Sequence, residues 1–225
     1  MLNSAHGTPV QDIFSVAVLG AMNPAIHHPL WYRQVLNAID EVEFDAAMQG
    51  EVIVTPPLAQ FRTPTLLIQC AGNRWDVQAA SIDLFPQMLH LAGTTFNALE
   101  HTPVAAFGFN FDVQRTTAQT DVGACIARTL ERAPLGLEDA AGLGASFTHF
   151  ERVGVALSRV IVEPVPNEPA AVTVRINVHH DLKAMGVSGV FDLGVMLDAR
   201  LPAARDWANA RTERIVQALN TQGGT

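Results

Sequence analysis

The chain has 225 residues, of which 48% are hydrophobic and 16% are charged, and its formal net charge is −8 at pH 7. This length and apolar content are sufficient for a globular protein with a sizeable core. The acidic balance argues against a basic, phosphate-binding surface, so no nucleic-acid partner is expected. The low charge content favours a surface that another protein partly covers.

Membrane insertion and disulfide bonding are not expected either. No apolar run approaches the roughly 20 residues that span a bilayer, and no secretory signal pattern follows Met1. The two cysteines, Cys70 and Cys125, lie in a predicted strand and a predicted helix, where they are expected to be small buried hydrophobes. No membrane partner is therefore predicted, and the expected compartment is the cytoplasm.

The first elements are a lead-in, a strand and a helix. Residues 1–12 are polar and predict a flexible lead-in. Residues 13–19 are apolar and partly β-branched, which is typical of a strand buried on both faces. Pro29 suits the first turn of a helix over residues 29–39. Helical spacing predicts that the buried side of this helix contains Trp31, Val35 and Ile39.

An acidic run, DEVEFD, occupies residues 40–45. Because negative charge is unfavourable at a helix C-terminus, the run is predicted to be a solvated loop beyond the preceding helix. The alternatives are contact with a partner, or a strand that places Glu41, Glu43 and Asp45 on one face, where they could hold a hard cation.

The next segments predict an antiparallel ribbon, a helix and a long strand. Short β-rich runs separated by prolines and a hairpin turn extend from residue 52 to residue 79. Residues 82–99 carry apolar side chains at helical spacing, and Pro86 is tolerated if it lies in the first turn. Residues 104–113 alternate apolar and polar side chains and predict a half-buried strand central to the core.

The second part of the chain begins with Asp121, which can cap a helix over residues 122–132. Residues 133–145 are punctuated by glycine and proline and are the best candidate for a linker. Two long β-rich segments, residues 147–162 and residues 171–179, predict a hairpin.

These elements predict an α+β fold, with a mixed or mainly antiparallel sheet and amphipathic helices packed on one face. A single domain is expected over residues 13–220, followed by a tail at residues 221–225. The order strand, helix, strands, helix occurs twice, which suggests two similar halves at residues 13–115 and 121–220. The alternative is one ordinary sheet without duplication.

Motifs for cofactors and for catalysis are not complete anywhere in the sequence. Residues 142–147 begin like a dinucleotide-binding loop, but Phe147 stands where the third glycine is required. Residues 186–189 are one residue short of a nucleophile elbow, so Ser188 is interpreted as a turn residue. No cofactor is predicted.

Histidine pairs are the candidates for a transition-metal site, since neutral imidazole is a common ligand. His28, His179 and His180 are the candidate ligands. Neighbouring residues on a strand point to opposite faces, so His179 and His180 cannot both reach one site. Polar residues at a strand end are the preferred interpretation, and no metal is predicted.

Two polar strand faces are candidates for lining a pocket. If the two strands lie side by side, Asp112 would be placed beside Arg175 or His179 and could form a binding cleft or an acid–base pair. The alternative is a solvent-facing sheet surface without a ligand. The two faces carry Asn110, Asp112 and Gln114, and Arg175, Asn177 and His179. A locally basic strip is also predicted from Arg152, Arg159 and Arg175.

A terminal amphipathic helix is predicted over residues 201–219, where Ala204 and Ala208 permit close helix contact and Trp207 is a candidate interface anchor. The leading hypothesis is therefore a non-catalytic cytoplasmic protein that acts through protein–protein contacts, as a homo-oligomer or with an assembly partner. The alternative is a small-molecule-binding protein or an enzyme that uses a polar sheet-face pocket containing Asp112, Arg175 and His179, with or without a metal bound by a histidine pair.

Overall fold

The computed structural model describes residues 12–131, 147–189 and 191–221. The predicted linker at residues 133–145 lies outside this part of the chain, as do nearly all of the lead-in and the tail. The strands are β1 (Ile13–Gly20), β2 (Ile53–Val54), β3 (Leu58–Arg62), β4 (Leu66–Ala71), β5 (Arg74–Ala79), β6 (Val104–Thr116), β7 (Phe147–Val153), β8 (Ala156–Val165) and β9 (Glu168–Asp181). The α-helices are α1 (Pro29–Gln34), α2 (Glu41–Gln49), α3 (Phe85–Ala98), α4 (Val122–Glu131) and α5 (Leu193–Thr221).

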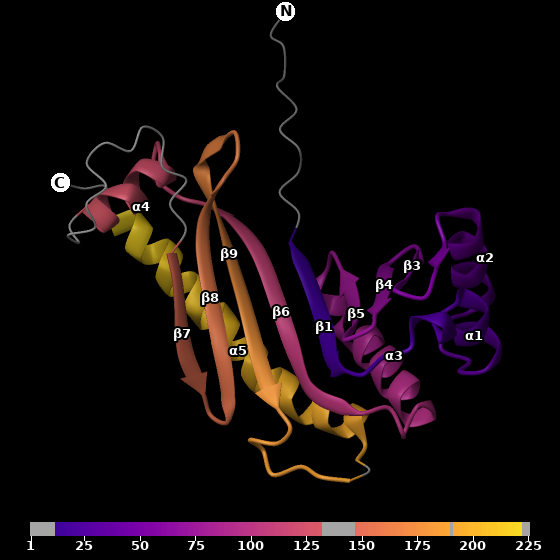
Figure 1. Ribbon diagram of the computed structural model, residues 1–225. Helices are drawn as coiled ribbons and strands as arrows, with labels where there is room; N and C mark the ends of the chain where they lie inside the picture. Colours follow the sequence, from indigo (N-terminus) through magenta and orange to yellow (C-terminus); the bar gives the residue numbers. More distant parts are fainter. Residues whose placement is uncertain (1–11, 132–146, 190, 222–225) are drawn as a thin grey trace, which may run out of the picture.

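All nine strands form one antiparallel sheet in the order β2-β3-β4-β5-β1-β6-β9-β8-β7. The long helix α5 lies behind β7, β8 and β9 in Figure 1, and α3 packs against β1 and β5. The predicted α+β fold, with an antiparallel sheet and helices on one face, is confirmed.

The core lies between the sheet and the helices because the central strands alternate as the sequence predicts. Phe107, Phe109 and Phe111 are buried on the helical side of β6. The ring of Phe85, at the start of α3, lies 6.3 Å from that of Phe109 and 5.6 Å from that of Phe111. Such aromatic contacts add to the free energy gained from apolar burial. Polar residues on alternate positions of the same strands are left for the other face.

The described strands are arranged in a similar but unequal way on either side of the central β1–β6 pair, with β5, β4, β3 and β2 beyond β1 and with β9, β8 and β7 beyond β6. A strand, helices, an antiparallel ribbon and a long helix follow one another from β1 to α3, and the same order follows from β6 to α5. The halves predicted at residues 13–115 and 121–220 place β6 in the first half, whereas this topology places β6 at the head of the second series. A duplication of the chain remains a hypothesis.

The acidic run at residues 40–45 was wrongly predicted to be a loop, and it forms the start of helix α2. Negative charge is unfavourable at the C-terminus of a helix, but it is favourable at the N-terminus. Asp40 accepts a hydrogen bond from the backbone N–H of Glu43, and Glu43 accepts one from the backbone N–H of Asp40, at 2.8 and 3.0 Å. This capping box begins α2 and puts Glu41 in the first turn, where the helix dipole favours negative charge.

Several predicted boundaries were also wrong. Helix α1 ends at Gln34, and Val35 is 66% exposed, because the chain leaves the helix before Asn37, whose φ is 51°. The predicted strand at residues 147–162 is two strands, β7 and β8, since Gly154 turns the chain with φ of 62°. Helix α5 begins well before Pro202, which it accommodates in its interior.

Two glycines let α3 and α5 approach closely on the helical side. A Cβ built on Gly93 of α3 would lie 3.0 Å from the Cα of Gly194 in α5, which is closer than side-chain carbons normally come to backbone atoms. Among the described helices, none is both long and apolar enough to cross a membrane.

Candidate functional site

The face of the sheet opposite the helices carries the polar residues of the central strands, and we call it the open face. Register places Ser15 of β1 opposite both Gln78 of β5 and Asn110 of β6, and places Asn110 opposite Asn177 of β9. Asn177 in turn pairs with Arg159 of β8. The row therefore brings side chains from five strands together. The open-face residues that the site uses are Ser15, Ala17, Leu19, Arg74, Gln78, Gly108, Asn110, Asp112, Phe150, Leu157, Arg159, Arg175, Asn177 and His179.

A ladder of amide hydrogen bonds crosses the middle of the open face. Asn177 Nδ2 donates to Asn110 Oδ1 at 2.6 Å, and Asn110 Nδ2 donates to Ser15 Oγ at 2.7 Å. The ladder joins β9, β6 and β1 through side chains in addition to the backbone ladder. It also fixes the orientation of each amide, which is a requirement for a site that discriminates between donors and acceptors.

Asp112 and Arg175 are direct cross-strand partners, as the pocket hypothesis predicted for them. Arg175 Nε lies 3.5 Å from Asp112 Oδ2, and its Nη2 lies 2.7 Å from Glu163 Oε1. Burial raises the pKa of Asp112, and this outweighs the opposing effect of the Arg175 charge. The Arg175 guanidinium is shared between two carboxylates, so little of its charge is available to a further anion.

The other two arginines of the site differ in their partners. Arg74 pairs with Asp76, with its Nε 2.9 Å and its Nη2 2.8 Å from the same carboxylate oxygen. Arg159 is exposed, and it forms no ion pair or hydrogen bond with the residues that the structure describes, although its charge acts on the Asp112 carboxylate and opposes the rise of its pKa. The site therefore contains one arginine that no described carboxylate holds in direct contact.

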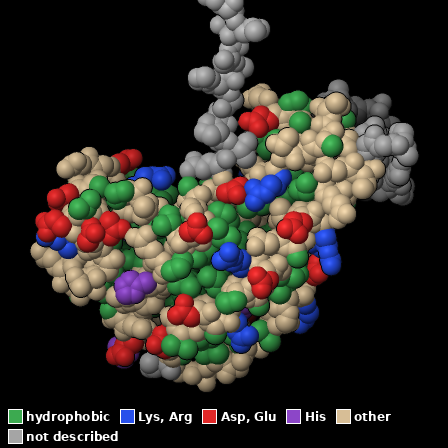
Figure 2. All heavy atoms as spheres, turned by 180° about the vertical axis from the view of Figure 1, so that it is seen from behind, with side chains coloured by type: hydrophobic (Ala, Val, Ile, Leu, Met, Phe, Trp, Pro, Cys, Tyr) green, Lys and Arg blue, Asp and Glu red, His purple; other side chains and the backbone are tan. Residues whose placement is uncertain are grey.

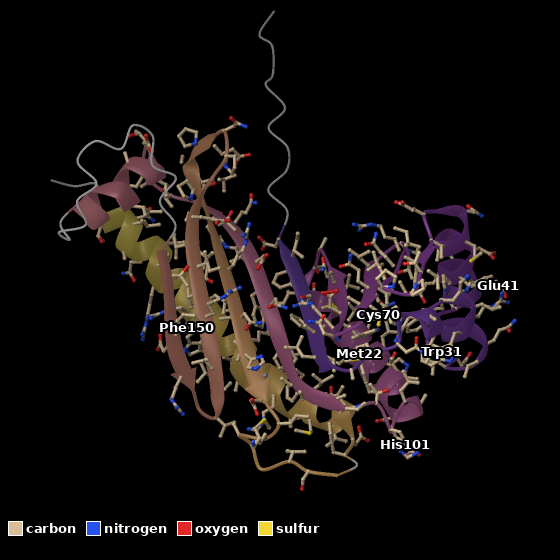
Figure 3. The ribbon with its side chains drawn as sticks, in the orientation of Figure 1. Met22, Trp31, Glu41, Cys70, His101 and Phe150 are labelled. Carbon is tan, nitrogen blue, oxygen red and sulfur yellow. The ribbon has the colours of Figure 1, made fainter. Side chains whose placement is uncertain are left out.

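Two hollows of about 320 Å³ and about 330 Å³ lie on the open face. Both are at the lower end of the volumes typical of small-molecule sites, about 300–1,000 Å³. The first extends toward Asp112 and Arg175, and the second toward Leu157 and Phe150 on the β7 side. Figure 3 shows Phe150 on β7, at the opposite end of the molecule from Trp31 and Glu41. The residues common to both hollows are Arg74, Asn110, Arg159 and Asn177.

His179 does not lie beside Asp112. It pairs with Gly108, four residues along the strand from the Asp112 pair, which corresponds to roughly 14 Å. Asp112 lines the first hollow and His179 the second. The structure therefore brings together Asp112 and Arg175, but it separates this pair from the imidazole that an acid–base interpretation would add.

The three candidate metal ligands lie in different parts of the protein. His180 is buried on the helical side, where its ring stacks on Phe107 at 4.6 Å, whereas His179 faces the open side. His28 caps α1 by accepting the backbone N–H of Leu30 at 3.1 Å. No group of three or more potential metal ligands occurs within the described ranges.

The candidate interface residues on α5 have two different environments. Ala204 and Ala208 are each only 2% exposed, so these small side chains face the protein's own core and not its surface. Trp207 is half-buried and packs against the same core from its edge. Figure 2 shows the helical side, where hydrophobic side chains gather near the centre with charged groups around them.

Sequence reasoning missed Ser15, Arg74 and Gln78. Ser15 stands inside an apolar run, and Arg74 belongs to the predicted hairpin turn, which covers residues 71–74. The alternation of Arg74, Asp76 and Gln78 along β5 was the signal that could have placed them on one face. Their convergence with β8 depends on the order of strands in the sheet, which local sequence patterns do not determine.

No protein-family model matches this chain, and no curated protein matches it as a relative.

Proposed function

We propose that this chain is a binding protein, not an enzyme, and that its open face holds a small anionic ligand. The observation that carries the proposal is the difference between the three arginines of the site. Carboxylates contact Arg74 and Arg175 directly, whereas Arg159 forms no direct ion pair among the described residues and interacts with Asp112 only through its field. A guanidinium presents five donors in a planar fork that suits carboxylate and phosphate groups.

The residues around Arg159 favour an anion on the side of this arginine that faces away from Asp112. Asp112 lies in the first hollow, and its carboxylate would repel an anion there. Asn177, the cross-strand partner of Arg159, and Asn110 provide amide groups between the two hollows. The proposed anion therefore binds over this shared middle, with Arg159 as its main cation and Arg74 at the far wall.

A non-catalytic role fits these residues better than a reaction. Asp112 is held by Arg175, and His179 lies in the other hollow, so neither is paired with a group that would activate it. This function is the alternative that the sequence left open, restricted to binding.

Protein–protein contact in the cytoplasm, the leading hypothesis from the sequence, is retained as a second proposal. Its support is the group of hydrophobic side chains near the centre of the helical side (Figure 2), and its proposed occupant is a second copy of the chain. Trp207 is the residue whose side chain tests it. We expect Trp207→Ala to convert a dimer to a monomer in sedimentation velocity, and a wild-type protein that is monomeric at high concentration would refute the proposal.

Native mass spectrometry of the full-length protein, isolated gently from its own cells, tests the binding function. We expect a reproducible small added mass on each subunit, which Arg159→Ala abolishes. Arg205→Ala is the matched control, because Arg205 is an exposed arginine on α5. A wild-type protein that carries no added mass, or an added mass that persists in Arg159→Ala, would overturn the proposal.

A further inference from the structure

The two hollows on the open face differ in chemistry on either side of the four residues that they share. Beyond the shared residues, the first hollow is lined by the polar groups of Ser15, Gln78, Asp112 and Arg175, and also by Ile13, Ile161 and Ile176. The second is lined by Ala17, Leu19, Gly108, Phe150, Leu157 and His179, and no carboxylate is among its described lining residues. One groove thus runs from an end that contains a carboxylate, across the arginines and amides, to an end whose walls include Leu157 and Phe150.

The floor of the apolar end lies at the level of the backbone. Ala17 and Gly108 are direct cross-strand partners on the two central strands, and both line this hollow. A Cβ added to Gly108 would lie 3.2 Å from the carbonyl oxygen of Val178 and 3.3 Å from Asn177 Nδ2. The tight packing favours glycine at this position, because the Asn177 amide and the β9 backbone lie where a side chain would stand.

The walls of this end expose apolar surface that a ligand can cover. Leu157 is 47% exposed and Phe150 is 64% exposed, although both belong to regular strands. Apolar surface removed from water stabilises a complex in proportion to its area. A flat apolar group lying on the floor would cover parts of both walls, and it would have the Arg159 guanidinium beside it, since Phe150 and Arg159 are cross-strand partners.

We infer that the second hollow binds a flat apolar group, such as an aromatic ring, that carries a phosphate or a carboxylate. The anion lies over Arg159 and Asn177, and the ring lies against Leu157 in the hollow that Ala17 and Gly108 line. Repulsion by Asp112 sets this orientation, because it excludes the anion from the opposite end of the groove. The inference rests on the proposed anion-binding function and adds the class of ligand.

The test compares phenyl phosphate with inorganic phosphate, each titrated into the full-length protein and followed by NMR of its backbone amides. We expect phenyl phosphate to bind about tenfold more tightly, because the ring covers apolar surface that phosphate leaves exposed. Arg159→Ala should weaken both ligands. Leu157→Ser should weaken phenyl phosphate alone, by about three- to tenfold.

Val155→Ser is the matched control, because Val155 is 54% exposed in the same hairpin and does not line either hollow. It should leave both affinities unchanged. Equal affinity for the two ligands, or an affinity for phenyl phosphate that Leu157→Ser does not change, overturns the inference about the ring and leaves anion binding intact. Binding of neither ligand, or binding that Arg159→Ala does not alter, refutes the anion site itself.

Discussion

The side-chain amide of Asn177 donates a hydrogen bond of 2.6 Å to Asn110, and this contact joins β9 to β6 in the middle of the open face. Asn110 is held in turn by Ser15 of β1, because its Nδ2 donates a hydrogen bond to the Ser15 hydroxyl. The central pair of strands and their neighbour are thus linked by side chains that also line both hollows. Stability and the geometry of the proposed site therefore depend on the same amides.

Asn110→Ala removes both of these hydrogen bonds, whereas Asn177→Ala removes one. Asn110→Ala should therefore lower the free energy of unfolding more, by about 1–3 kcal/mol against about 0.5–1.5 kcal/mol. Urea denaturation of both variants and of the double variant measures the effects. The double variant should lose less than the sum of the two, because the shared bond is counted twice. Strict additivity would show that the amides do not interact in solution.

Asp40→Ala removes the side chain that caps α2. The loss should lower the free energy of unfolding by about 0.5–2 kcal/mol, since a backbone N–H at the helix start is left without its acceptor. Thermal or urea unfolding measures the change. Asp45→Ala serves as the control, because Asp45 is an exposed carboxylate in the same helix. Equal effects of the two substitutions would argue against the capping role.

The spacing of apolar residues correctly predicted the elements that face the core on one side and polar surroundings on the other. The alternation from Phe107 to Val113 correctly placed a half-buried strand in the core, because a period of two leaves one face for the core and one for polar groups. The acidic run before residue 46 was misread because the same charges suit a loop or a helix start. The signal that identifies the helix start is the capping box, in which Asp40 is followed three residues later by Glu43. Such a pair of residues is not detected by hydrophobic periodicity.

The candidate site was predicted in part for a similar reason. Alternation placed Asp112 and Arg175 on polar faces, and pairing of their strands joined them at 3.5 Å. His179 was separated from Asp112 by the register, which a residue pattern alone does not fix. Arg74 and Arg159 line the same hollows only because the sheet order places β5 and β8 on either side of the centre.

Gly93→Val tests the close contact between α3 and α5. A side chain at this position would meet the backbone of Gly194 at 3.0 Å, so the helices must separate or the local backbone must shift. We expect the free energy of unfolding to fall by about 1–3 kcal/mol, as for other overpacked sites. Gly72→Ala is the control, because no heavy atom lies within 4 Å of a Cβ at Gly72. A Gly93→Val protein as stable as wild type would contradict the contact.

His180 should make the protein sensitive to acid. Burial against Phe107, assisted by the positive charge of Arg200, lowers the pKa of His180 from 6.5 to about 4. Its Nδ1 has no hydrogen-bond partner among the described residues, and an interaction with the backbone of Val178 opposes the lowering of the pKa without offsetting it. Between pH 6.5 and pH 4 the unfolded chain takes up a proton that the folded chain excludes. The free energy of unfolding must therefore fall as the pH falls through this window.

Replacing His180 by phenylalanine removes that proton uptake while keeping a ring on Phe107. We expect His180→Phe to lose about 1–3 kcal/mol less stability than wild type between pH 7 and pH 4.5, measured by urea denaturation across the range. The comparison uses the slope with pH and not absolute stability, so any change in packing cancels. His90→Gln, on the exposed side of α3, should retain the wild-type slope. If the stability of His180→Phe changes with pH in parallel with that of wild type, His180 takes up its proton as readily in the folded protein as in the unfolded chain.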